Sequence, residues 1–123
     1  MTKSLTLTGN IKRLDGTTEL MNEALSITQN YTEFADQEIT IAASATDTAI
    51  SFSGVTTGQM VILVPTYLGS GTGYLTMKIN AGAEAIKFGK LGVIGGNGAN
   101  GITAVTITNP DASNAVQLKV YIV

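Results

Sequence analysis

The sequence predicts an all-β fold: an antiparallel β-sandwich, jelly-roll-like, with eight to nine short strands and a possible N-terminal arm. β-Branched residues are abundant, with 18 Thr, 12 Ile and 8 Val among 123 residues, and such side chains pack better on a pleated sheet than in a helix. Short segments of alternating apolar and polar residues recur, with turn residues at the ~8–12-residue intervals typical of sandwiches. Only one short stretch has helical spacing.

The N-terminal segment begins as a strand. Residues 4–8 read Ser-Leu-Thr-Leu-Thr, the strict alternation of a half-buried strand. A Gly-Asn pair at 9–10 interrupts it, and an Asp-Gly turn signal follows at 15–16. We therefore expect residues 1–14 to form an N-terminal arm or first strand and residues 15–123 to form a single β-sandwich domain.

Residues 18–24 form the stretch with a helical pattern. Thr18 can act as an N-cap. Apolar residues then recur at helical spacing, at Leu20, Met21, Ala24 and Leu25. We expect one or two helical turns here, followed by a strand over residues 25–31, where the period returns to two.

The rest of the chain supplies the strands of the sandwich. Residues 59–64 are a continuous apolar run closed by Pro65, which is typical of a strand buried on both faces and predicts the central strand. The other expected strands lie at 38–41, 49–52, 74–80, 85–88, 102–108 and 116–122. Eight strands in a double Greek key, with the first strand as an arm, would make a jelly roll.

The missing residue types exclude several kinds of chemistry. Cys and His are both absent, which removes disulfides, thiol nucleophiles, the commonest general base and the commonest metal ligand. No apolar run approaches the ~20 residues of a membrane helix, and the first residues lack the features of a secretory signal. We expect synthesis in a cytoplasm and no membrane partner.

Charged residues are few and unevenly distributed. They make up 13% of the chain, about half the usual share, so either neighbouring molecules or hydroxyl and amide groups cover the surface. Residues 1–13 carry three bases and no acid, whereas residues 14–77 carry seven acids and no base. A basic N-terminal segment could be steered onto an acidic neighbour, although chance spacing is the alternative. Basic residues are not interleaved with aromatic ones, so we expect no nucleic-acid partner.

A dinucleotide-type spacing, Gly-x-Gly-x-x-Gly, occurs at Gly96, Gly98 and Gly101. Such a turn needs a following helix whose N-terminus meets the pyrophosphate. Residues 102–107 are instead strand-like, and the acid expected ~20 residues further on is missing. We expect a glycine-rich loop between strands and no cofactor.

Two polar clusters raise the possibility of catalysis or metal binding. Glu33, Asp36 and Glu38 could form an acid pair for glycoside hydrolysis or ligate calcium, yet three acids at a strand start are more often a solvated loop. The Asn and Asp residues of 109–114 could also hold calcium, but such residues usually stabilise turns by bonding their own backbone. We expect no catalytic or metal-binding residue.

Two segments are candidate interfaces. The first strand could detach and add to a neighbour's sheet, and the glycine-rich segment near residues 91–96 carries apolar side chains that would mark an interface if exposed. Ordinary strands are the alternative for both. The candidate interface residues are Lys3, Leu5, Leu7, Lys12, Arg13, Leu91, Val93, Ile94, Gly96 and Gly98. Tyr67 and Tyr74 bracket a glycine-rich loop and are possible glycan contacts, with core or cross-strand packing as the alternative for Tyr74.

About half of the chain carries a resemblance to a known class of proteins. Residues 37–41 and 47–64 place a strand ahead of a Gly-Val-Thr-Thr-Gly turn and a core strand after it, and residues 74–80 add an alternating strand. In this arrangement the chain resembles the small jelly-roll decoration (cement) proteins and related auxiliary virion proteins of tailed bacteriophages.

The resemblance implies a non-enzymatic virion structural protein that binds and stabilises the phage head lattice. Its expected partners are the major capsid protein and copies of itself, as a trimer. It would be made in the host cytoplasm and located on the capsid surface. The alternative is a phage tail or fibre-tip module, or a carbohydrate- or receptor-binding β-sandwich.

Overall fold

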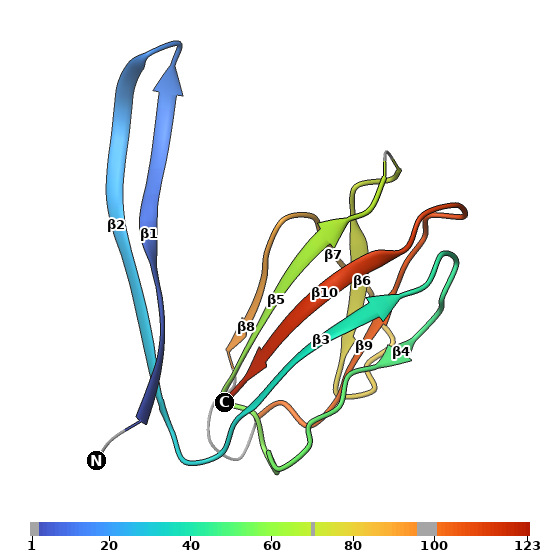
Figure 1. Cartoon of the computed structure of the whole chain (residues 1–123). Helices are drawn as coiled ribbons and strands as arrows, with labels where there is room; N and C mark the ends of the chain where they lie inside the picture. The colour runs from blue at the N-terminus through green and yellow to red at the C-terminus, as the bar shows by residue number, and fades with distance from the viewer. Residues whose placement is uncertain (1–2, 70, 96–100) are drawn as a thin grey trace. The chain divides into compact units, whose positions relative to one another are not determined.

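The computed structural model describes residues 3–69, 71–95 and 101–123, and the chain divides into two units, Met1–Thr32 and Glu33–Val123. The first unit is a β-hairpin and the second is a β-sandwich (Figure 1). Every regular element among the described residues is a strand. Accordingly, that part of the chain contains no helix long and apolar enough to cross a membrane. The all-β prediction is confirmed.

The strands described in the second unit form two antiparallel sheets of four strands each. The first has the order β3 (Ala35–Ile41), β10 (Val116–Ile122), β5 (Met60–Tyr67), β8 (Gly92–Gly95). The second has the order β4 (Thr48–Ala49), β9 (Val105–Thr108), β6 (Leu75–Ile79), β7 (Ile86–Phe88). Each sheet therefore alternates early and late strands, which is the arrangement of a double Greek key and confirms the jelly-roll-like sandwich.

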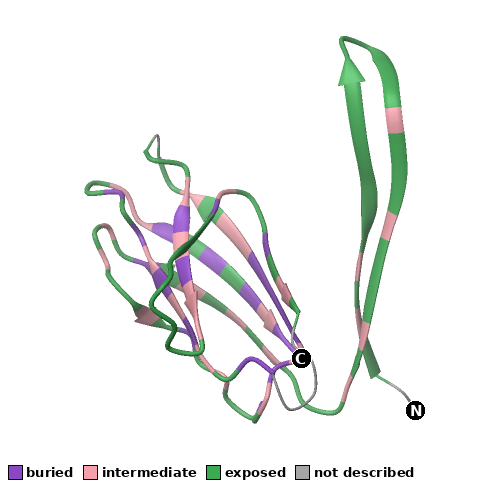
Figure 2. Ribbon diagram, turned by 180° about the vertical axis from the view of Figure 1, so that it is seen from behind, coloured by how far each residue is buried: buried purple, intermediate pink, exposed green. Residues whose placement is uncertain are grey.

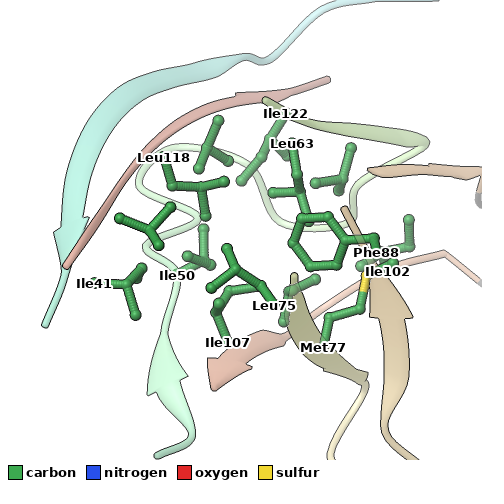
Figure 3. Packing of buried hydrophobic residues seen from close by; sticks show 14 of the residues in the cluster. Ile41, Ile50, Leu63, Leu75, Met77, Phe88, Ile102, Ile107, Leu118 and Ile122 are labelled. Carbon is green, nitrogen blue, oxygen red and sulfur yellow. The ribbon is translucent and has the colours of Figure 1, made fainter. Parts of the chain in front are cut away.

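The core lies between these two sheets. Along β10, Val116, Leu118, Val120 and Ile122 are buried, whereas Gln117 and Lys119 between them are exposed. Side chains of the second sheet meet them from the opposite side (Figure 3). The strict alternation in the sequence thus places one face of β10 against the opposite sheet.

β5 is an inner strand, as the sequence predicted. It pairs with β10 on one side and β8 on the other, and Met60 to Leu63 are buried. The strand continues through Pro65, which pairs with Leu118 of β10 and lies beyond the four residues that pair with β8. The missing proline N–H therefore falls where β5 has one neighbour, a position that a sheet tolerates.

β8 is the strand that the sequence did not separate from a glycine-rich loop. It pairs with β5 from Gly92↔Leu63 to Gly95↔Met60. A Cβ at Gly92 would lie 3.2 Å from the Phe88 ring, so glycine lets this edge strand approach the core closely. β8 completes the eight sandwich strands in place of residues 25–31, which belong to the hairpin.

The hairpin consists of β1 (Lys3–Asp15) and β2 (Thr18–Tyr31). Its two-residue connection begins at Gly16, which has φ 62°, as type II′ turns require at their first central position. Pairing runs through residues 9–10 without a break, so the expected interruption there is absent. The first unit ends at Thr32, whereas the sequence placed the boundary near the hairpin turn, after residue 14.

The expected helical turns at residues 18–24 are wrong, because this segment is the first half of β2. Residues four apart lie on one face of a strand as well as of a helix, so Met21 and Leu25 fit both patterns. A β-bulge between Arg13 and Leu14 in the pairing leaves Leu20 without a register partner, which accounts for the adjacent apolar pair. The cross-strand hydrogen bonds of a long hairpin outweigh a short helical pattern of this kind.

Candidate functional site

The hairpin has two chemically different faces. Residues paired across an antiparallel ladder project to the same side, and successive residues alternate sides. One side, which we name the apolar hairpin face, contains Lys3, Leu5, Leu7, Gly9, Ile11 and Arg13 of β1, paired with Tyr31, Gln29, Ile27, Leu25, Glu23 and Met21 of β2. Seven of these twelve residues carry large apolar or aromatic side chains.

The other side of the hairpin is polar. Between residues 4 and 12 of β1 its paired residues are Ser, Thr, Asn and Lys apart from Ala24, and the hydroxyl oxygens of Thr6 and Thr28 form a cross-strand hydrogen bond of 3.2 Å. Beyond the bulge, Leu14, which is 57% exposed, pairs with Glu19. Lys12 lies on this polar side, paired with Asn22. Of the sequence-predicted interface residues in this segment, the structure therefore places Lys3, Leu5, Leu7 and Arg13 together and Lys12 apart from them.

The apolar hairpin face has no second layer within its own unit. Ile11 is 49% exposed and Ile27 is 39% exposed, and Figure 2 shows both strands as mostly exposed. An isolated two-stranded hairpin is at best marginally stable in water, and a contiguous exposed apolar patch marks an interaction site. This face is the leading candidate functional site.

The edge strand β8 is a second candidate. Val93 is 37% exposed, and Leu91, just before the strand, is 47% exposed. Ile94 points the other way and packs against the core. Within the described residues β8 pairs with β5 alone, so its other edge offers unpaired backbone groups. The predicted contacts Gly96 and Gly98 lie outside the described residues.

The chain after the glycine-rich run is held by Asn80, a residue that the sequence did not single out. The Asn80 Oδ1 accepts hydrogen bonds from the N–H groups of Thr103 (2.7 Å) and Ala104 (3.2 Å), and its Nδ2 donates to the Gly101 carbonyl (3.1 Å). Asn80 has φ 52°, a conformation that asparagine tolerates better than most residues. The sequence signal was an Asn-Ala-Gly turn at the end of an alternating strand.

Gly101 is the one glycine of the dinucleotide-type spacing that lies within the described residues. Ile102 forms an isolated bridge with Gly58, and β9 follows. Gly101 thus leads into extended chain, whereas a phosphate cradle needs the free N–H groups of a helix.

Both candidate glycan-binding tyrosines make contacts within the sandwich. Tyr67 packs against the core, and its hydroxyl donates to the Gly89 carbonyl at 2.5 Å. Desolvation of this hydroxyl raises its pKa above the ordinary value. The Lys87 ammonium lies 4.1 Å from the centroid of the Tyr74 ring, a cation–π contact that occupies one ring face.

The acids at residues 33–38 do not converge. A Glu33 carboxylate oxygen accepts from the Thr56 N–H at 2.9 Å, while Asp36 and Glu38 lie on β3 beside Tyr121 and Lys119. No group of three His, Cys, Asp or Glu side chains that could hold a metal ion occurs in the part of the chain that the structure describes.

The Asn-Asp segment at residues 109–114 forms a hydrogen-bonded turn. Asp111 Oδ1 accepts from the N–H groups of Ser113 (2.8 Å) and Asn114 (3.0 Å), and Oδ2 accepts from Thr72 N–H (3.2 Å). The hydrogen bond from Ser113, followed by that from the Asn114 side chain, lowers the pKa of Asp111. This carboxylate accepts from three backbone N–H groups and from the Asn114 side chain, as expected of an acid that stabilises a turn.

Comparisons with known proteins identify no relative of this chain. No family model matches the chain, and neither a curated protein nor a solved structure does. The described residues offer an exposed apolar face on a hairpin and an exposed edge strand, which are features suited to binding other chains.

Proposed function

We propose that this protein is a non-enzymatic structural protein of a bacteriophage virion, a decoration protein that binds and stabilises the head lattice. Its partners are the major capsid protein and neighbouring copies of itself. The sequence resemblance to phage decoration proteins supports this proposal, as do the jelly-roll-like body and the low proportion of charged residues.

The single observation that carries the proposal is the apolar hairpin face. A 13-residue strand paired with a 14-residue strand and exposing Ile11 and Ile27 is poorly suited to a chain that works alone, because apolar surface in contact with water is costly. In a lattice, neighbouring molecules cover such a surface. The exposed Leu91, just before β8, and Val93, on β8, provide a second contact of the same kind.

The tyrosine positions give no such support to a carbohydrate-binding module. Tyr67 is engaged with the core and Gly89, and Tyr74 is engaged with Lys87. These contacts engage the Tyr67 hydroxyl and one face of the Tyr74 ring, so the exposed hairpin is the stronger ground and we propose the decoration role.

The test is the copy number of the protein in purified virions, measured by quantitative mass spectrometry against the major capsid protein. A head decoration protein is expected at hundreds of copies, because it follows the symmetry of the lattice. Its absence from particles would contradict the proposal, and a dozen or fewer copies would assign it to a tail or vertex.

A variant lacking residues 2–10 tests the role of the hairpin in attachment. This deletion removes more than half of β1 and leaves every sandwich strand intact. We expect reduced occupancy on particles with the β-sheet circular dichroism of the sandwich retained. A matched control is Thr6→Ser, which keeps a hydroxyl on the polar side, and unchanged occupancy for the deletion would refute attachment through the hairpin.

A further inference from the structure

We infer that the apolar hairpin face is covered by the same face of a second copy of this chain, with the two hairpins stacked antiparallel about a two-fold axis. The inference deepens the proposed function by naming the neighbour of the hairpin. It is tested in solution, without particles, so that its failure is distinguishable from failure of the decoration role.

The hairpin needs another layer in order to be stable. Two strands alone are marginal, and packing of a hydrophobic face is what makes a small sheet persist. Two stacked hairpins would form a four-stranded sandwich whose interior consists of the two apolar faces, with the Thr- and Ser-rich sides facing water. Stacked sheets lie ~10 Å apart, a gap that such side chains fill.

The register of β1 is self-complementary in the antiparallel stack. If the two-fold axis crosses the strands between the Leu7 and Gly9 positions, Leu7 of one copy faces Gly9 of the other, and Leu5 faces Ile11. A Cβ at Gly9 would meet no atom within 4 Å, so open space exists there for an incoming leucine. Large and small residues therefore interdigitate, as close packing requires.

The register of β2 gives the same result with a polar pair included. Its facing pairs are Ile27 with Leu25, Gln29 with Glu23 and Tyr31 with Met21. The Gln29 Nε2 donates one N–H to the Asn30 carbonyl at 3.0 Å, and its second N–H can donate to the Glu23 carboxylate of the other copy. Apolar side chains thus face apolar ones, and the two polar side chains of this strand face each other.

The parallel stack lacks this complementarity. With the axis along the hairpin, β1 of one copy faces β2 of the other at the same level, so Ile11 would face Glu23 and Leu5 would face Gln29. Each carboxylate would then lie against an apolar side chain, which is costly. The one unfavourable pair in the antiparallel stack is Lys3 with Arg13, at the ends, where solvent screens the charges.

Charge favours a second copy as the occupant. The side chains of the hairpin carry three bases and three acids, so two copies meet without net repulsion. The bases are Lys3, Lys12 and Arg13, and the acids are Asp15, Glu19 and Glu23. The turn end is net acidic and the open end is basic, so antiparallel stacking brings opposite ends together.

The area of the apolar hairpin face sets the expected affinity between two copies. Ten residue steps of ~3.4 Å and two strand widths of ~4.8 Å give roughly 330 Å² for each face, which is less than the ~800 Å² per partner of a standard stable interface. Association through the hairpin is therefore expected to depend on concentration, and to be favoured where copies are held close together on a lattice.

Cysteine cross-linking tests the register, because the natural chain contains no Cys. Full-length Leu7→Cys is mixed with a size-tagged Gly9→Cys variant and treated with a short bismaleimide. We expect a mixed dimer at roughly fivefold or more the yield of the polar-face control, Thr6→Cys mixed with Thr8→Cys, because those positions face away from the partner. A mixture of Leu7→Cys and Ile27→Cys reports the parallel stack.

Three results would overturn the inference. They are preferential linkage of Leu7→Cys to Ile27→Cys, equal linkage on both faces, and no linkage above the control at any concentration. The last would mean that the face is covered within one chain or by a different protein. Virion copy number is measured separately and is unaffected by these outcomes.

Sedimentation of full-length variants provides a measurement that needs no added cysteine. Leu7→Asp is expected to weaken dimerisation by at least ~10-fold, since it places a charge in the stacked interior, while Thr8→Asp on the polar side leaves it unchanged. Equal effects of the two substitutions would refute pairing through the apolar hairpin face, whatever the oligomeric state of the wild type.

Discussion

Replacing Asn109 by Ala removes the most deeply buried polar side chain described in the sandwich. Asn109 is 1% exposed, and its Nδ2 donates to the carbonyls of Asn114 (2.9 Å), Ala42 (3.2 Å) and Ile41 (3.4 Å). Its Oδ1 accepts from the Asp111 N–H at 3.1 Å. One amide thereby joins the end of β3 to the turn that precedes β10.

The expected loss of unfolding free energy follows from the hydrogen-bonding groups that Asn109→Ala leaves without partners. The Asn109 amide supplies two N–H donors and one oxygen acceptor. At about 1 kcal/mol for each buried hydrogen bond, the variant should lose roughly 3 kcal/mol of unfolding free energy. A sandwich of this length has an unfolding free energy of ~5–14 kcal/mol, so the loss is a large part of its stability. For a domain of this size each kcal/mol lowers Tm by about 4–8 °C, and the expected fall in Tm is therefore roughly 10–25 °C.

The assay is thermal and urea unfolding of the full chain, followed by circular dichroism. Gln117→Ala is the matched control, because it truncates an exposed amide on β10 and should change the unfolding free energy by less than about 0.5 kcal/mol. If Asn109→Ala unfolded within ~1 kcal/mol of the wild type, the reasoning that this amide joins β3 to the turn would be refuted.

Three further variants probe the same sandwich. Gly71→Ala is expected to cost ~1–3 kcal/mol of unfolding free energy, because its Cβ would overlap the Asp111 Oδ2; wild-type stability would show that the loop moves freely. Asp111→Asn should destabilise the protein at neutral pH. Because hydrogen bonds lower the pKa of Asp111 in the folded state, the difference in unfolding free energy between wild type and variant should shrink as the pH falls below about 4. A difference that stays the same at every pH in urea titrations would contradict this. Asn80→Ala should cost about 2–3 kcal/mol by removing its bonds to residues 101–104, with Asn22→Ala on the polar side of the hairpin as a near-neutral comparison.

The strands of the sandwich were largely predictable, because alternation and apolar runs report directly on burial. The run at residues 59–64 became the inner strand β5, and the alternation at 116–122 became β10. β8 was not distinguished from a loop, because its two glycines lack the side chains that give a strand its pattern. Pairing with β5 supplies the order that the local sequence does not specify.

The candidate site was only partly predictable. The alternation identifies Leu5 and Leu7, but their β2 partners fall in a segment expected to be a sandwich strand, and the β2 residues opposite Ile11 and Arg13 fall in the segment expected to be helical. A residue spacing of four suits either structure, so the pattern alone could not show that Met21 and Leu25 lie across from Arg13 and Gly9.

The sequence by itself determined the all-β class, the inner strand and the absence of cysteine and histidine chemistry, since these depend on residue type and local period. Tertiary structure decided which strands are neighbours, and through that the composition of each face. Pairing β1 with β2 gathers apolar residues from two segments onto one side of the hairpin. Such a surface is made by contacts between segments that are distant in the sequence. No local pattern predicts these contacts, because they depend on the register of strand pairing, which the connecting loop sets.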